Sequence, residues 1–253
     1  MTKTLERISQ HSFLPEFLPA GARVLDLGGN RGEFTVPMAL RYGCLVTAVE
    51  PVPQLARDLE ARGIDVIQAA ITAYDGEVAL TYDMDKELTG SVMDLAVVGG
   101  LLEATGSRTT TMVAAASLES ILKRTGPVSL LKVDIEGAEL DMILEANADT
   151  LRSIDQITVE FHDFWYPELR DRTEEAKQRL KDIGFHMIRF TPNNKDVLFI
   201  NKRLPLPTWK RLYISSWLRN INGLWRAGRV GMTAVTSRLG RARAGIQEQH
   251  SAA

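Results

Sequence analysis

Two stretches of this chain combine acidic residues with tight turns, and the first is VLDLGGNRGEF at residues 24–34. Asp26 lies in an apolar run that predicts a buried strand, and Gly28 and Gly32 follow in a turn that opens a helix. Glu50 comes at the end of the next apolar run, which predicts a second strand. An acid at that point of a parallel sheet accepts hydrogen bonds from ribose hydroxyls. The pattern therefore predicts a nucleotide-type site at the carboxyl end of a parallel sheet.

The spacing of the glycines distinguishes between two kinds of nucleotide cofactor. A dinucleotide fingerprint needs Gly-x-Gly-x-x-Gly, so that a pyrophosphate can sit on a helix N-terminus. Here Asn30 holds the place of the middle glycine, and no third glycine follows at the required offset. An acid at Asp26 suits a cationic ligand, and S-adenosylmethionine carries an amino group, a sulfonium and no phosphate. The pattern favours S-adenosylmethionine over NAD, while a purely structural turn between strand and helix is the alternative.

The second stretch is LLKVDIEGAELDMI at residues 130–143. Asp134 comes where a buried strand leaves the sheet, and Glu136 and Glu139 lie in the turn and first helical positions. Ligands of open α/β sheets bind outside the carboxyl ends of the strands, so these acids face the predicted cleft. Complementing the helix N-terminus is a sufficient role for Glu139, whereas Asp134 needs a partner. Lys132 is one option, although neighbours on a strand point to opposite faces.

The next apolar run ends in VEFHDFW at residues 159–165, which brings Glu160 and His162 to the same edge. An acceptor hydroxyl loses its proton to a carboxylate or an imidazole within hydrogen-bond reach, and His162 is the only histidine so placed. A histidine held structurally by a carboxylate is the alternative. A divalent metal could also be bound by these two residues with Asp134 and Glu136. No spacing demands a metal, and none is expected.

The composition is that of an ordinary globular enzyme. The chain has 253 residues, of which 45% are hydrophobic and 25% charged, so we expect one domain or one domain with an appendage. Cys44 is the single cysteine, which excludes an intrachain disulfide. The N-terminus does not have the pattern of a signal peptide, and no apolar run reaches the length of a membrane span. A cytoplasmic location is the default expectation.

Apolar patterns alternate along the chain and predict a mostly parallel, doubly wound α/β sheet. Strands are expected at residues 23–27, 45–49, 65–69, 78–82, 129–133 and 156–160, and helices at residues 33–42, 53–62, 118–124, 139–146 and 167–183. Residues 185–190 and 196–200 predict a terminal antiparallel hairpin, which adds an antiparallel edge strand. Residues 83–112 are rich in Gly, Ser and Thr, and are interpreted as a loop or lid over the site, or as an insertion.

The net charge of −2 conceals an asymmetry between two parts of the chain. Residues 202–253 hold ten basic residues and one acid, a balance of +9, and the rest holds 20 basic and 31 acidic residues, a balance of −11. We expect a domain at 1–202 and a basic appendage at 203–253, with a disordered end. Residues 208–226 form an amphipathic helical pattern. Packing on the domain or on a second subunit is favoured over binding to an anionic membrane surface at the inner face. No motif supports specific nucleic-acid binding.

The motifs VLDLGGNRGEF…AVEP, SLESIL, LLKVDIEGAELDMI and ITVEFH resemble those of the FkbM family of S-adenosylmethionine-dependent methyltransferases, over about residues 20–202. The resemblance implies a Rossmann-like class I methyltransferase fold. It also implies S-adenosylmethionine as cofactor and, as acceptor, often a sugar or natural product. Gly29 departs from the family, which commonly has alanine there. The matching residues are Asp26, Gly28, Asn30, Gly32, Glu50, Pro51, Lys132, Asp134, Glu136, Gly137, Glu139, Glu160 and His162.

The expected reaction is O-methylation of a hydroxyl on a sugar, glycan or natural product. An NAD-dependent oxidoreductase, or a non-catalytic scaffold that binds a cofactor and acts through the basic tail, are the alternatives. For catalysis we expect Asp134 or His162 as the base and Glu136 as the residue that orients the acceptor. The expected cofactor contacts are Asp26, Gly28, Asn30 and Gly32 around the methionine side, Glu50 on the ribose, and Ala70 and Ile71 on the adenine.

Overall fold

A computed structural model describes residues 4–83, 90–91 and 108–218 of the chain. The chain divides into two compact units, residues 1–205 and residues 206–253. The second unit contains the helix α8 (Thr208–Leu212) and a π-helical turn (Tyr213–Leu218), and the disordered end predicted for the tail lies outside the described residues. Within the described ranges, no helix has the length and apolar character needed to cross a membrane.

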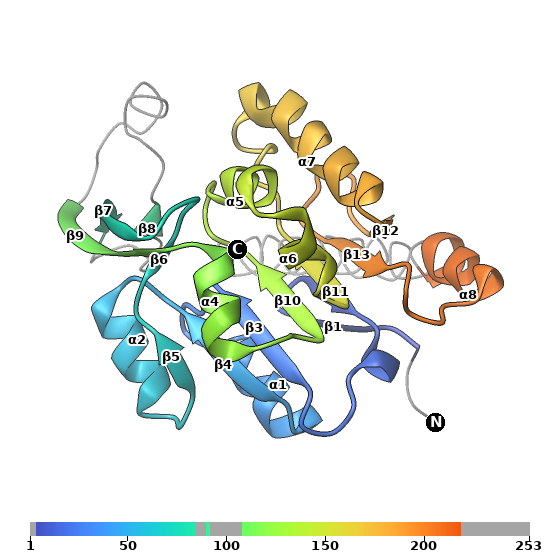
Figure 1. Cartoon of the computed structure of the whole chain (residues 1–253), viewed down its shortest axis with the longest axis horizontal. Helices are drawn as coiled ribbons and strands as arrows, with labels where there is room; N and C mark the ends of the chain where they lie inside the picture. The colour runs from blue at the N-terminus through green and yellow to red at the C-terminus, as the bar shows by residue number, and fades with distance from the viewer. Residues whose placement is uncertain (1–3, 84–89, 92–107, 219–253) are drawn as a thin grey trace, which may run out of the picture. The chain divides into compact units, whose positions relative to one another are not determined.

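The first unit is built on a central sheet with the strand order β12-β13-β11-β10-β3-β4-β5 (Figure 1). The strands β3, β4, β5, β10 and β11 pair in parallel, which confirms the mostly parallel α/β sheet. Their bounds are β3 (Arg23–Leu27), β4 (Leu45–Val49), β5 (Asp65–Ile67), β10 (Leu130–Val133), β11 (Gln156–Val159), β12 (Phe185–Arg189) and β13 (Val197–Asn201).

The terminal hairpin is present, but the antiparallel strand is not at the edge as expected. β13 runs antiparallel to both neighbours and lies between β11 and β12, so β12 forms the edge. The burial of the two strands gives the physical reason. Every residue of β13 is buried, whereas only Phe185 and Ile188 are buried in β12. A strand that is apolar on both faces is stable only inside the sheet.

Helices and a short hairpin cover the two faces of the central sheet. On one face α4, α5 and α7 pack against β3, β10 and β11 in the main core. On the other face α1 packs with the N-terminal hairpin in a second core that includes Phe13, Phe34 and Met38. The helices are α1 (Thr35–Tyr42), α2 (Pro53–Glu60), α4 (Leu118–Thr125), α5 (Glu139–Glu145), α6 (Ala148–Arg152) and α7 (Arg170–Asp182).

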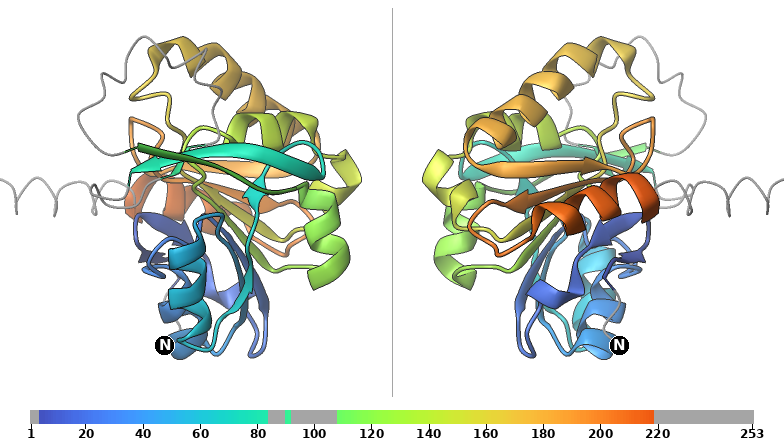
Figure 2. Two further views of the ribbon diagram at one scale, coloured as in Figure 1. Left: turned by 90° about the vertical axis from the view of Figure 1, so that its left-hand side faces the viewer. Right: turned by 90° about the vertical axis from the view of Figure 1, so that its right-hand side faces the viewer.

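A second sheet, with the order β6-β9-β7-β8, lies beyond β5 in the chain. Its long strands β7 and β9 run antiparallel and side by side (Figure 2). The strand expected at 65–69 ends early, because residues 70–71 pair with β9 instead. Residues 108–112, interpreted as part of a loop or lid, belong to β9, and residues 84–89 and 92–107 lie outside the described residues. The strands are β6 (Ala70–Ile71), β7 (Gly76–Asp83), β8 (Gly90–Ser91) and β9 (Arg108–Ala116).

An N-terminal hairpin that the sequence did not predict is attached to the central sheet. It consists of β1 (Glu6–Ile8) and β2 (His11–Phe13). The Ser12 amide and hydroxyl both donate to the buried carboxylate of Asp196, at 3.0 and 2.8 Å. The side chain of Gln156 on β11 exchanges two hydrogen bonds with the backbone of Leu14. These bonds fix the hairpin, and with it His11, beside the ends of the central strands.

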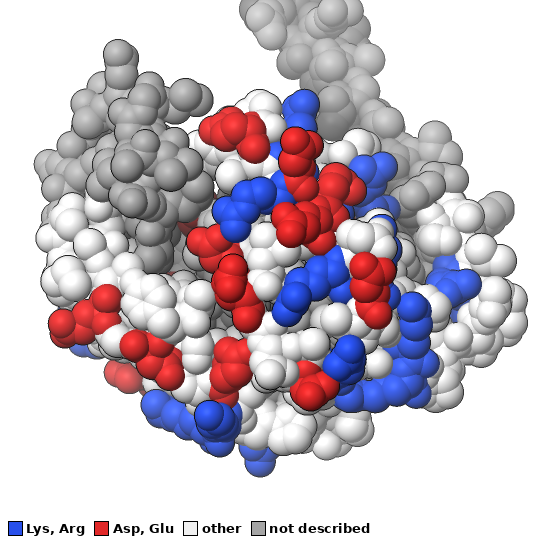
Figure 3. Space-filling model, turned by 45° about the horizontal axis from the view of Figure 1, so that its top comes forward, with Lys and Arg blue, Asp and Glu red and all other residues white. Residues whose placement is uncertain are grey.

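On the face seen in Figure 3, the Lys and Arg side chains of the described residues lie intermingled with Asp and Glu side chains.

Candidate functional site

The glycine-rich turn after β3 is pressed against the neighbouring strands. Gly28 has φ +81°, and a Cβ there would lie 1.9 Å from the carbonyl oxygen of Asp134. Only glycine fits so close an approach. The amides of Gly28 and Gly29 both donate to the carbonyl of Val49, at 3.0 and 3.2 Å. The turn is therefore held between the ends of β10 and β4.

Glu50 follows β4 and is 4% exposed. Its Oε2 accepts from the Asn30 amide at 2.8 Å and its Oε1 from the Val52 amide at 2.9 Å. Burial raises the pKa of this carboxyl, and the two backbone hydrogen bonds oppose that effect only in part. Since a carboxylate oxygen has two lone pairs, each oxygen keeps one acceptor site for a hydroxyl.

Asp26 and Lys132 form a buried pair beneath the glycine-rich turn. The register of β3 and β10 sets them opposite each other, and Lys132 Nζ lies 3.0 Å from Asp26 Oδ1. Thr35 donates to the other oxygen of Asp26 at 2.5 Å. Lys132 also donates to the carbonyl of Gly28 at 2.6 Å. The pair therefore joins β3, β10 and the turn, and Asp26 itself is fully buried.

Lys132 also serves as a partner of Asp134, since its Nζ lies 3.6 Å from Asp134 Oδ2. The argument that neighbouring strand residues face apart does not apply, because these two are two positions apart and share a face. Burial lowers the pKa of Lys132, but the carboxylates of Asp26 and Asp134 outweigh it, so the pKa is raised.

An imidazole lies among carboxylates where β10 and β11 end. His162 Nδ1 lies 3.0 Å from Glu139 Oε1, and the His162 amide donates to the same oxygen at 3.2 Å. The other oxygen of Glu139 accepts from the Gly137 amide at 2.8 Å. The interpretation that Glu139 only complements a helix N-terminus is therefore wrong. Glu139 is completely buried, and it orients the His162 ring.

The other ring nitrogen of His162 faces two acids. Its Nε2 lies 3.4 Å from Glu136 Oε2 and 3.8 Å from Asp134 Oδ1. Burial disfavours the charged ring, but the hydrogen bond that the ring donates to Glu139 and the charges of the surrounding acids raise the pKa of His162 to about 9. The ring is therefore an imidazolium at neutral pH.

The acids of the cluster differ in their own pKa values. Burial opposes ionisation of Asp134, but Lys132, His11 and His162 hold its pKa well below the usual range. Glu136 has φ +50°, a conformation that costs energy for a residue with a side chain. Burial, with the charges of nearby acids, raises the pKa of Glu136.

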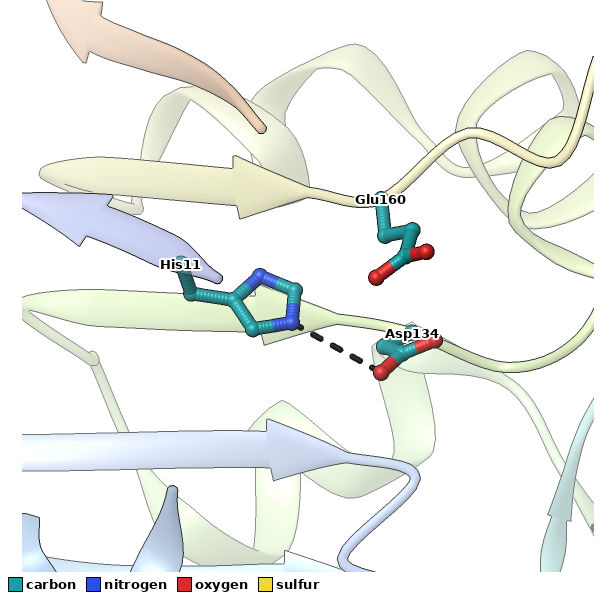
Figure 4. Close-up of side chains that lie close together, drawn as sticks. All are labelled: His11, Asp134 and Glu160. Carbon is teal, nitrogen blue, oxygen red and sulfur yellow. Dashed lines mark ion pairs between the residues drawn. The ribbon is translucent and has the colours of Figure 1, made fainter. Parts of the chain in front are cut away.

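His11 completes the cluster, although no sequence motif pointed to it. It is 1% exposed, and its Nε2 lies 3.6 Å from Asp134 Oδ2 (Figure 4). Glu160, after β11, points toward the same place, and its Oε1 lies 3.5 Å from Lys195 Nζ. The three-residue strand that carries His11 gives no periodic signal, and its position depends on contacts with residues far along the chain.

The structure thus brings together Asp134, Glu136 and His162, and sets the turn of Gly28, Asn30 and Gly32 with Glu50 at the neighbouring strand ends. Ala70 and Ile71 lie in β6, and their side chains are 1% and 3% exposed.

Part of this chain is similar in sequence to known proteins. A family model described as the methyltransferase FkbM domain matches residues 26–187. A curated protein called Methyltransferase 1, from Beauveria bassiana (strain ARSEF 2860), is 27% identical over 165 residues, which are 57% of this chain and 66% of that protein.

Two solved structures are also similar. One is methyltransferase FkbM from Methylobacillus flagellatus KT, with 15% identity, a TM-score of 0.44, and coverage of 71% of this chain and 43% of that chain. The other is a TehB-like SAM-dependent methyltransferase from Corynebacterium glutamicum ATCC 13032, with 11% identity, a TM-score of 0.40, and coverage of 74% and 86%. The match spans less than two thirds of both the curated relative and the FkbM structure.

Proposed function

Because this chain belongs to the FkbM methyltransferase family, we propose that it transfers a methyl group from S-adenosylmethionine to a hydroxyl oxygen of a sugar, glycan or natural product. S-adenosylmethionine is the cofactor, and its sulfonium supplies a methyl group that is already activated. One observation carries the proposal. The glycine-rich turn with Glu50 and the cluster of Asp134, Glu136 and His162 lie at the carboxyl ends of adjacent strands, β4, β3, β10 and β11.

The residues at the turn fit this cofactor. Glu50 is fixed by two backbone amides and keeps acceptor capacity on both oxygens, which suits a ribose diol. The Asn30 amide, which would face a pyrophosphate in a dinucleotide turn, is already bonded to Glu50. That bond favours a cofactor without phosphate and argues against the NAD-dependent alternative.

On the acceptor side, we assign His162 as the base and Asp134 as the acceptor of the hydroxyl hydrogen bond. The ring acts as a base in its neutral form, which predominates only above about pH 9. The imidazole is held by Glu139, so it is already oriented when the hydroxyl arrives. Glu136 is 40% exposed, which suits a residue that orients the acceptor. Alignment of the acceptor oxygen with the sulfonium methyl group supplies most of the rate enhancement. The methyl donor is already activated, and binding of both reactants in one site removes the entropic cost of bringing them together.

Calorimetric titration of the purified full chain with S-adenosylmethionine, S-adenosylhomocysteine and NAD tests the cofactor site. We expect binding of the first two, weakened strongly by Glu50→Ala and less by Glu50→Gln, which keeps one acceptor oxygen. Asp58→Ala, on the exposed side of α2, is the matched control. Binding of NAD alone would overturn the proposal.

Transfer is then measured with isotopically labelled S-adenosylmethionine and a panel of glycans and natural products that carry free hydroxyls. Label in a methyl ether is expected. Label found only on nitrogen would contradict O-methylation. A protein that binds the cofactor but labels no acceptor in a broad panel would favour the non-catalytic scaffold.

For the appendage we propose a contact with a second copy of the chain through residues 208–226. In the described part, Trp209 and Leu212 are 68% and 56% exposed, a large apolar surface for so short a helix. Residues 219–226 lie outside the described residues. Light scattering of wild type and of Trp209→Ala/Leu212→Ala measures whether the chain forms an oligomer and whether these two side chains are needed for it. Flotation with anionic vesicles checks peripheral membrane binding, the alternative to a cytoplasmic location.

A further inference from the structure

Two groups of possible ligand side chains meet at Asp134. His11, Asp134 and Glu160 offer ligand atoms within 4.8 Å of one another, and so do Asp134, Glu136 and His162. The second group is used by the function proposed above. Asp134 belongs to both groups. His11 and Glu160 have no role in that function, although the first group brings together three separate segments of the chain (Figure 4).

His11 is the unexplained member of the first group. It is almost completely buried, and among the described residues neither ring nitrogen has a hydrogen-bond partner. Buried polar atoms are paired in the great majority of cases, so an imidazole left without a partner calls for an explanation. The hydrogen bonds of Ser12 and Leu14 hold the hairpin in place on either side of this ring.

The distance between His11 and Asp134 indicates what is missing between them. The 3.6 Å from His11 Nε2 to Asp134 Oδ2 is too long for a hydrogen bond. Two ligands of one tetrahedral ion, with bonds of about 2.1 Å, lie about 3.4 Å apart. In Figure 4 the ring of His11 and the carboxylate of Glu160 both point toward Asp134. The separation is that of two groups that share a cation.

We propose that His11, Asp134 and Glu160 bind a divalent first-row transition-metal ion. One imidazole with two carboxylates is a ligand set for Mn²⁺, Fe²⁺ or Zn²⁺, whereas Mg²⁺ and Ca²⁺ prefer oxygen alone. Sequence spacing did not predict a metal, because His11 lies more than a hundred residues before the two acids.

Two lysines compete with the ion for the same carboxylates. Lys132 lies closer to Asp26, at 3.0 Å, than to Asp134, at 3.6 Å. Lys195 lies 3.5 Å from Glu160 Oε1 and 4.1 Å from the centre of the Phe164 ring. Its side chain is 26% exposed, so it can turn away toward solvent when an ion arrives. Removal of the Lys195 charge should therefore strengthen metal binding.

The role of the ion in transfer rests on the function proposed above. Three protein ligands leave open positions, and a hydroxyl bound there becomes more acidic. The O–H proton passes to neutral His162, the O–C bond forms, and the C–S bond breaks with its electron pair retained by sulfur. Asp134 links the two groups, since Oδ2 faces His11 and Oδ1 faces His162.

The test is a titration of the chelator-treated full chain with Mn²⁺, followed by electron paramagnetic resonance. Wild type is expected to bind one ion with nitrogen coupling from a histidine. His11→Gln and Glu160→Gln should each weaken binding about tenfold or more, and His11→Gln should abolish the nitrogen coupling. His186→Gln, on the edge strand β12, is the histidine control, and Lys195→Gln should bind more tightly.

Thermal unfolding and calorimetry with S-adenosylmethionine, both under chelator, show whether each variant is folded. Absence of Mn²⁺ binding by wild type at millimolar concentration, or equal binding by folded His11→Gln, overturns the inference. Either result leaves the proposed function in place if the cofactor still binds. Failure of wild type to bind S-adenosylmethionine overturns the proposed function instead.

Discussion

The carboxylate of Glu139 contacts both the ring and the backbone amide of His162. Its Oε1 lies 3.0 Å from the Nδ1 atom of the ring and accepts from the backbone amide of the same residue at 3.2 Å. Its Oε2 accepts from the Gly137 amide in the turn that carries Glu136. One buried acid on α5 therefore sets the orientation of both the candidate base and the acceptor-binding turn.

Glu139→Gln is expected to lower the pKa of His162, because a neutral amide no longer stabilises the imidazolium. In a profile of kcat/KM against pH, the rising limb should move from about 9 toward neutral pH. The maximal kcat should also fall, since the ring is less well oriented, while the Kd for the cofactor stays unchanged. Glu145→Gln, at the other end of the same helix, is the control. A rising limb that stays near pH 9 in Glu139→Gln would contradict this role.

The stability of the fold should depend on pH through His162. Its pKa is raised from 6.5 to about 9, so the folded state binds the proton more tightly than the unfolded state. The resulting stabilisation, on the order of 3 kcal/mol, is complete below pH 6.5 and is lost as pH rises through about 9. Urea unfolding of wild type and His162→Gln under chelator measures it. The difference in unfolding free energy between the two should shrink over that range, and a constant difference would refute the shift.

The steric contact at Gly28 can be separated from its backbone conformation. Gly28 and Gly43 both have positive φ, +81° and +63°, but a Cβ at Gly43 meets nothing within 4 Å. Gly43→Ala should therefore lower the unfolding free energy only through the strained backbone conformation, by about 1–2 kcal/mol. Gly28→Ala adds a clash with the Asp134 carbonyl and should lower the unfolding free energy by about 4 kcal/mol or more. Equal unfolding free energies for the two variants would show that the turn can move away from β10.

The sequence predicted best those strands whose first and last residues are set by a local apolar run and the polar residues beside it. β4 was predicted with its bounds, because an apolar run there is closed by Glu50. Asp134 and His162 were placed at one edge since the carboxyl ends of parallel strands meet there. The same rule predicted that these acids lie near the glycine-rich turn after β3.

The parts that the sequence did not predict depend on distant contacts. His11 reaches the site because Ser12 bonds to Asp196, which lies 184 residues later. Glu139 stands at the start of a helix, a position equally compatible with an exposed acid, and only its burial reveals the bond to His162. The interior place of β13 was indicated by its continuous apolar run, but strand order is set by packing of the whole sheet.

The pair of Asp26 and Lys132 gives the last prediction. Lys132→Met leaves a carboxylate buried without its counter-ion, which is expected to cost about 3–5 kcal/mol of unfolding free energy. The double variant Asp26→Asn/Lys132→Met removes both charges and should recover part of that loss. Lys123→Met, on the exposed face of α4, is the control and should have little effect. Because Lys132 also holds the Gly28 carbonyl, both variants should bind S-adenosylmethionine more weakly. A double variant no more stable than Lys132→Met would show that the two charges are not coupled in the fold.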